Sequence, residues 1–161
     1  MIPERIQPFF KTTFQKTDNG NSIVEGLLNC CAAHEFEVFV VGKIKRGIFS
    51  KMHIIPENNQ IVLKVRCKKC GRVISVFDSN CDGYEKCGIN SPTQALAQPI
   101  NCMKCHNGCF SVDVKYEYCD IHELEEREIE KIDNAFTWVW ISIKCNKCGA
   151  IYKNFIDYET A

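Results

Sequence analysis

Twelve cysteines in 161 residues give this sequence its clearest chemistry. Two stretches, "VRCKKCGRVI" (65–74) and "IKCNKCGAIY" (143–152), carry the same Cys-x-x-Cys-Gly turn with strand-forming residues on both sides. Two cysteines separated by two residues can face one metal ion if the backbone turns tightly, and the following glycine permits the positive φ that such a turn needs. Each turn supplies two thiolates, so each needs two further donors to complete a tetrahedral zinc site.

For the second turn, the missing donors lie upstream in "PINCMKCHNG" (99–108). Two Cys-x-x-Cys pairs flanked by strands are typical of a four-thiolate structural site. The predicted ligands are Cys102, Cys105, Cys145 and Cys148. A thioredoxin-like redox pair would open a helix, whereas β-prone residues follow both turns. The same four thiolates could also hold iron, so the choice between zinc and iron stays open.

For the first turn, "NCCAAH" (29–34) occupies the corresponding upstream position. The internal repeat, with its CxxH spacing, predicts a site of three cysteines and one histidine, formed by Cys31, His34, Cys67 and Cys70. Two alternatives remain open. Cys30 could replace Cys31 beside His34, or the downstream Cys81 and Cys87 could replace both upstream ligands.

The elements that must position these ligands follow the same repeat. Each half reads as a Cys/His cluster, two strands, the Cys-x-x-Cys-Gly turn and a further strand. In the second half, apolar and polar residues alternate strictly over 110–118, which predicts a half-buried strand. Asp120, followed three residues later by Glu123, resembles a capping box and predicts a helix over 120–134.

In the first half, 36–44 and 60–66 have the composition of strands. We therefore predict a β-rich α+β fold of two zinc-ribbon-like antiparallel units, with one helix in the second. The first half spans 1–80 and the second 99–161. Residues 81–98 are rich in Gly, Pro, Ser and Asn without periodicity, which indicates a linker.

The chain resembles small, uncharacterised bacterial proteins with tandem zinc ribbons. The resemblance rests on "GKIKRGIFSK" (42–51), "CKKCGRVISVFDS" (67–79) and "AFTWVWISIKCNKCGAIYKNFIDYETA" (135–161), and it extends over most of 25–161. It implies a zinc-ribbon fold and bound metal, and it implies no activity.

Composition indicates the environment of the cysteines. Charged residues make up 25% of the chain and the net charge is zero. We see no signal peptide and no apolar run near the roughly 20 residues that span a bilayer. We therefore expect a cytoplasmic protein with no membrane partner, in which reduced cysteines are available to bind metal.

These features favour a non-enzymatic zinc-binding protein. A four-thiolate site has no open coordination position for water, and the sequence has no glycine-rich phosphate loop or nucleophile motif. The first hypothesis is a protein-protein interaction module, an adaptor or inhibitor. Trp138 and Trp140 would lie on one strand face and contact the partner, unless the helix covers them.

The second hypothesis is nucleic-acid binding through a basic band over 43–72. In this band Glu57 is the one acid, and the basic residues are Lys43, Lys45, Arg46, Lys51, Lys64, Arg66, Lys68, Lys69 and Arg72. Phe49 is interleaved with them. Such a band would neutralise backbone phosphates, whereas the acidic second half would repel them.

Overall fold

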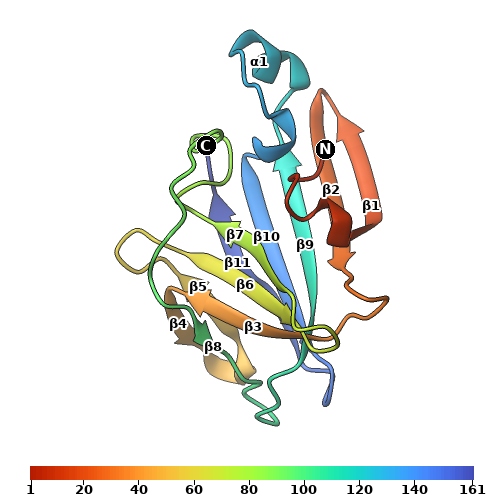
Figure 1. Cartoon of the computed structure of the whole chain (residues 1–161), viewed down its shortest axis with the longest axis vertical. Helices are drawn as coiled ribbons and strands as arrows, with labels where there is room; N and C mark the ends of the chain where they lie inside the picture. The colour runs from red at the N-terminus through yellow and green to blue at the C-terminus, as the bar shows by residue number, and fades with distance from the viewer.

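The computed structural model describes residues 1–161, apart from the side chain at position 50. Its main feature is a curled antiparallel sheet (Figure 1). One part of the sheet has the strand order β1-β2-β9-β10-β11. These strands are β1 (Phe10–Asp18), β2 (Asn21–Leu28), β9 (Phe110–Tyr118), β10 (Trp138–Cys145) and β11 (Ile151–Glu159). The predicted β-rich character is confirmed.

The other part of the sheet has the order β8-β3-β6-β7. Its strands are β3 (Phe36–Val41), β6 (Val62–Cys67), β7 (Val73–Asp78) and β8 (Gln98–Pro99). The two parts meet where Phe36 of β3 pairs with Phe110 of β9. A separate hairpin of β4 (Lys43–Arg46) and β5 (Met52–Ile55) lies beside β11. Short 3-10 turns occur at Gln7–Phe9 (η1), Ile48–Ser50 (η2) and Ile132–Asn134 (η3).

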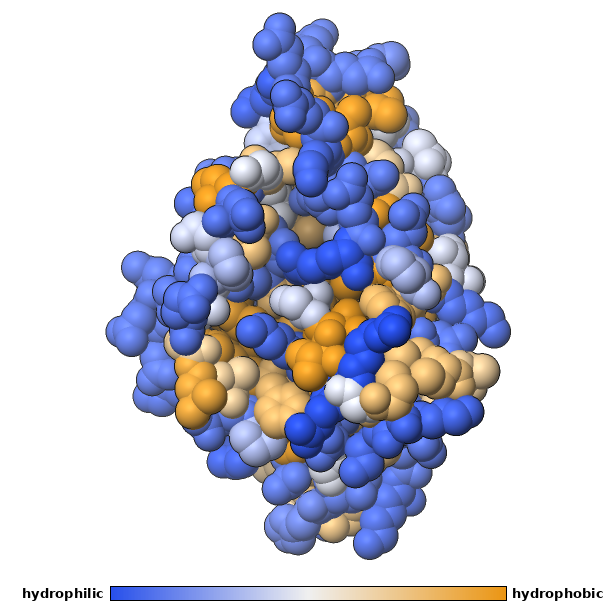
Figure 2. All heavy atoms as spheres, viewed as in Figure 1, coloured by the Kyte–Doolittle hydropathy of each residue, from blue (hydrophilic) through white to orange (hydrophobic). Residues whose placement is uncertain are grey.

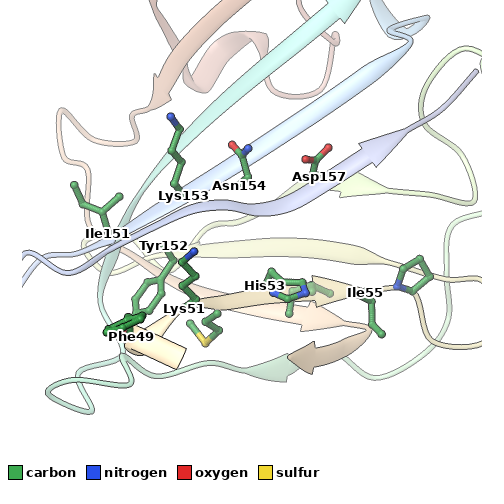
Figure 3. Close-up of a pocket in the computed structure, with 12 residues that line it drawn as sticks. Phe49, Lys51, His53, Ile55, Ile151, Tyr152, Lys153, Asn154 and Asp157 are labelled. Carbon is green, nitrogen blue, oxygen red and sulfur yellow. The ribbon is translucent and has the colours of Figure 1, made fainter. Parts of the chain in front are cut away.

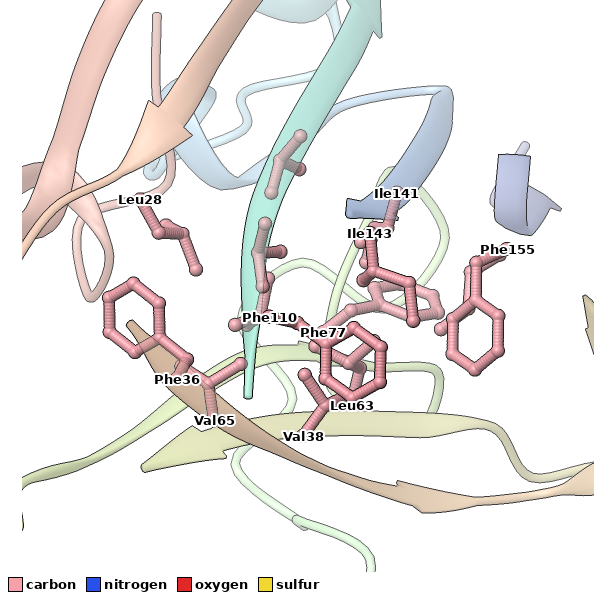
Figure 4. Close-up of a cluster of buried hydrophobic side chains, with 14 of the residues drawn as sticks. Leu28, Phe36, Val38, Leu63, Val65, Phe77, Phe110, Ile141, Ile143 and Phe155 are labelled. Carbon is pink, nitrogen blue, oxygen red and sulfur yellow. The ribbon is translucent and has the colours of Figure 1, made fainter. Parts of the chain in front are cut away.

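The core lies between the two parts of the sheet. Strand residues alternate between faces, so every second side chain of β9, from Phe110 to Tyr118, is buried. Side chains from β3, β6 and β7 meet those from β9, β10 and β11 in one cluster (Figure 4), which includes Val38, Leu63, Phe77, Ile141 and Phe155. Full burial of each such side chain contributes about 1.5–3 kcal/mol to folding.

The predicted helix over 120–134 is much shorter in the structure. Asp120 caps its start, and its carboxylate accepts a hydrogen bond from the backbone N–H of His122 at 2.9 Å. The helix α1 spans only Ile121–Glu126, and the chain turns at Glu128, where φ is +55°. Leu124 is its buried residue, so too little apolar surface packs to stabilise further turns. Most of the side chains at this end of the molecule are hydrophilic, with some hydrophobic ones visible between them (Figure 2).

The segment predicted as a linker, 81–98, is held against the rest of the chain by polar contacts. The buried Asp82 forms an ion pair with Arg5. The Asp78 carboxylate accepts hydrogen bonds from the backbone N–H and the hydroxyl of Thr93, each at 2.7 Å. The sheet itself also runs across both halves, because β2 pairs with β9.

Within the described residues, no helix combines the length and the apolar character needed to cross a membrane.

Candidate metal centres

The structure gathers eight cysteines into two groups of four, and in each group all four sulfurs lie within 4.8 Å of one another. The first group is Cys30, Cys31, Cys67 and Cys70, and the second is Cys102, Cys105, Cys145 and Cys148. A tetrahedral zinc ion with Zn–S bonds of about 2.3 Å would place its sulfurs about 3.8 Å apart. The sulfurs of Cys30 and Cys70 are 3.6 Å apart, and those of Cys102 and Cys148 are 3.5 Å apart. Both groups could therefore hold a metal ion.

Three of the cysteine turns share one backbone geometry. In the 67–72 turn, the N–H of Gly71 donates to the carbonyl of Cys67 at 2.9 Å, and Gly71 has φ +74°. Gly149 donates to Cys145 at 3.0 Å with the same φ. In the 102–107 turn His106 takes the glycine's place, with φ +59° and a 2.8 Å bond to Cys102. Each turn points its two sulfurs to one side, as the Cys-x-x-Cys spacing predicted.

Polar groups around the second group favour the thiolate form of Cys102 and Cys145. The Tyr152 hydroxyl lies 3.2 Å from the sulfur of Cys102 and accepts a hydrogen bond from the N–H of Met103 at 2.9 Å. This distance allows the hydroxyl to donate its proton to a Cys102 thiolate. Burial opposes ionisation of Cys145, but hydrogen bonds from the backbone amides of Cys148 and Lys147 outweigh it and lower the pKa of Cys145 to about 6.

The first group would not be fully ionised without a cation at its centre. Burial raises the pKa of the Cys30 thiol to about 12, and the neighbouring sulfurs of Cys70 and Cys67 add to this effect. In contrast, the hydrogen bond from the backbone of Arg72 lowers the pKa of Cys70 to about 7. Four neighbouring thiolates repel one another, and a divalent cation at their centre would remove that penalty.

A tight turn places both adjacent cysteines in the first group. Cys30 and Ala33 exchange two backbone hydrogen bonds of 3.0 Å. The intervening Cys31 and Ala32 both have positive φ, +56° and +55°, which is the geometry of a type I′ turn. This turn directs the buried Cys30 and the exposed Cys31 toward the 67–70 turn.

The structure therefore differs from the predicted first site at one ligand. It brings Cys31, Cys67 and Cys70 together, but Cys30 stands where His34 was expected. The two-residue turn reverses the chain before His34, whose Nδ1 instead donates to the Leu28 carbonyl at 2.7 Å. The sequence signal for Cys30 was its adjacency to Cys31. The sequence pattern indicated Cys30 only as a replacement for Cys31, and it did not place both in one site because type I′ turns usually carry Asn or Gly, not Cys-Ala.

The alternative ligands Cys81 and Cys87 lie elsewhere. The Cys87 sulfur donates to the Lys131 carbonyl at 3.2 Å, and Cys81 lies beside the Asp82 carboxylate. In the second group, the structure brings together the same four cysteines that the sequence predicted.

The predicted tryptophan face lies on β10. The rings of Trp138 and Trp140 stack at 5.5 Å with an interplanar angle of 10°. The Lys115 ammonium lies 4.4 Å above the Trp140 ring, and Trp138 Nε1 donates to the Asp157 carboxylate at 2.6 Å. Both tryptophans are half-buried.

The predicted basic band divides into two parts. On β6 and near β7, Arg66 pairs with Glu37 at 2.6 Å, and the Arg72 guanidinium lies over the Phe9 ring. The other part lies on the β4–β5 hairpin, whose exposed basic side chains are Lys43, Lys45, Arg46 and Lys51.

Comparisons of the chain with protein-family models, curated proteins and solved structures return no match.

Proposed function

We propose that the protein is a non-enzymatic binding protein whose fold is held by two structural zinc ions. The observation that carries this proposal is the pair of four-cysteine groups with sulfurs at tetrahedral spacing. Thiolate ligands select zinc over harder cations, and four of them fill its coordination shell. A filled shell offers no position at which a substrate or water could be activated.

The position of the two centres supports a structural role. The starts of β3 and β9 and the ends of β6 and β10 converge at one end of the molecule, where both centres lie (Figure 1). A metal ion in each centre would hold the two parts of the sheet together at this end. Because the unfolded chain has no preformed site, the free energy of metal binding adds to the free energy of folding.

The partner in this proposal is another protein, bound on the outer face of β9, β10 and β11. Trp138 and Trp140 form a rigid aromatic platform there, flanked by the charged Lys115 and Asp157. Stacked tryptophans bordered by polar groups resemble binding hot spots, which are enriched in Trp. Partner binding would bury the part of each ring that the chain leaves exposed.

Elemental analysis of the untagged protein, purified under reducing conditions, tests the metal proposal. We expect two zinc ions per chain. Folded protein that contains iron, or no metal, would overturn the proposal.

Affinity purification with the Trp140→Ala variant tests the partner proposal. A partner bound at this face should co-purify with the wild type and be lost with the variant, while the zinc content stays unchanged. Phe14→Ala is the matched control, because Phe14 is 49% exposed on β1. Equal loss of the partner in both variants would show that the tryptophan face is not the binding site.

A further inference from the structure

The β4–β5 hairpin has one apolar face and one basic face. Met52 and Ile54 are buried against the core, whereas Lys45 and His53 pair across the two strands with both side chains exposed. Every charged residue from 43 to 56 is basic. The outward face of this hairpin therefore carries positive charge without local compensation.

The tip of the hairpin presents two apolar side chains to solvent. Ile48 is 78% exposed and Phe49 is 92% exposed. Phe49 has φ +60°, a left-handed conformation that costs a residue other than glycine about 1–2 kcal/mol. The chain thus holds an aromatic ring outward, beside Lys51, at a conformational cost and without burial in return.

A groove of about 730 Å³ runs between this hairpin and β11. Phe49 and Lys51 lie near Tyr152 at one end, and His53 and Ile55 continue along β5 (Figure 3). Lys153 adds a further positive charge. Among the described lining residues, Asp157 is the one carboxylate, and it already accepts the hydrogen bond from Trp138.

We propose that this groove binds single-stranded nucleic acid. The lysines that line the groove, Lys51 and Lys153, would contact phosphates, and the Phe49 ring would stack on an unpaired base. A basic groove with an exposed aromatic side chain is the arrangement that binds single strands without sequence preference, because every base has a flat face to stack. An acidic peptide would match the charge but would leave the Phe49 ring without a planar partner. This inference goes beyond the proposed function and uses none of the metal-binding cysteines.

Fluorescence anisotropy with a labelled oligothymidylate of about 12 nucleotides tests the proposal. We expect saturable binding that weakens as salt rises from about 50 to 200 mM. Phe49→Ala should weaken binding about tenfold, since stacking contributes roughly 1–3 kcal/mol per base. Lys51→Gln removes a lysine that lines the groove and should reduce the slope of log affinity against log salt by about 0.7, the value for one phosphate contact on a single strand.

Matched controls come from other surfaces of the chain. Lys86→Gln removes an exposed lysine outside the groove, and Phe14→Ala removes an exposed aromatic ring on β1. Neither should change the affinity or the salt slope. Two zinc ions per chain in every variant would show that the fold is retained. Loss of nucleic-acid binding with the zinc content unchanged would then count against the groove and not against the zinc proposal.

Three results would overturn the inference. The first is the absence of salt-dependent binding by zinc-loaded wild type. The second is binding that Phe49→Ala and the lysine variant weaken no more than the controls do. The third is equal or tighter binding to a polyglutamate peptide or to phosphatidylserine vesicles, which would assign the groove to an acidic protein or to a membrane surface.

Discussion

The side-chain amide of Asn146 donates a hydrogen bond to the His34 carbonyl at 3.1 Å. Asn146 lies between Cys145 and Cys148, and His34 follows the turn that carries Cys30 and Cys31. This bond therefore joins the loops of the two candidate metal centres directly. The buried pair of Phe36 and Phe110 lies at the same junction. Loss of one centre should consequently loosen the other.

The two centres should release metal at different rates. Cys31 and Cys70 of the first centre are exposed, whereas Cys105 and Cys148 are partly covered and Cys102 and Cys145 are buried. A chelator or oxidant reaches exposed thiolates more readily. With a chromogenic zinc chelator we expect two phases of release. The fast phase should be missing in Cys30→Ser. A fast phase that disappears in Cys148→Ser instead would reverse the assignment.

Tyr152→Phe should weaken the second centre selectively. The change removes the hydroxyl that lies 3.2 Å from the Cys102 sulfur and that accepts the Met103 N–H. Loss of such an outer hydrogen bond typically reduces metal affinity by about 10–100-fold. Competition with a chelator of known affinity would measure this. Equal weakening of both centres would point to general destabilisation rather than to the lost bond.

Asp113→Asn should change how stability depends on pH. Burial, reinforced by the nearby Glu25 carboxylate, raises the pKa of Asp113 to about 6. In the unfolded chain its pKa is about 3.9. Ionisation is therefore costlier in the folded state, so wild-type stability falls as pH rises through this window, and the full penalty is present above pH 6.

At pH 7 the Asp113→Asn variant should be more stable than the wild type. Because Asp113 is only partly buried, solvent screening limits the gain to about 1 kcal/mol. The gain should shrink as pH falls from about 6 to 4. Urea unfolding of both zinc-loaded proteins across this range measures the difference, and the metal centres contribute equally to each. A gain in stability that grows toward low pH would contradict the raised pKa of Asp113.

The Arg5–Asp82 ion pair should anchor the 81–98 segment. Asp82 is buried, and Arg5 also donates to the Ser75 carbonyl at 2.7 Å. Arg5→Met leaves the carboxylate buried without its partner and should lower the free energy of unfolding by about 3–5 kcal/mol. The control Lys131→Met breaks the exposed pair with Glu4 and should cost less than about 1 kcal/mol. Similar small losses of unfolding free energy in both variants would show that Asp82 is solvated.

Local patterns in the sequence predicted much of the local structure. Strict alternation predicted the strand from Phe110 to Tyr118, because one face of it is buried throughout. The Cys-x-x-Cys-Gly spacing predicted turns that point two sulfurs together. The Asp120 cap was also predicted, but the length of its helix was not, because that depended on tertiary packing that only Leu124 supplies.

Long-range and strained features could not be predicted in this way. The pairing of β2 with β9 joins residues far apart in the chain, and no local pattern encodes it. The place of Cys30 depends on left-handed conformations at Cys31 and Ala32, which their residue types disfavour. The His34 ring had suitable spacing, but its position was set by the Leu28 carbonyl.

Native mass spectrometry of two variants tests the central claim most directly. Cys30→Ser removes a sulfur from the first group, and His34→Ala removes the histidine that lies outside it. We predict two zinc ions in the wild type and in His34→Ala, and one in Cys30→Ser. Retention of two ions in Cys30→Ser, together with loss of one in His34→Ala, would contradict the four-cysteine assignment of the first centre.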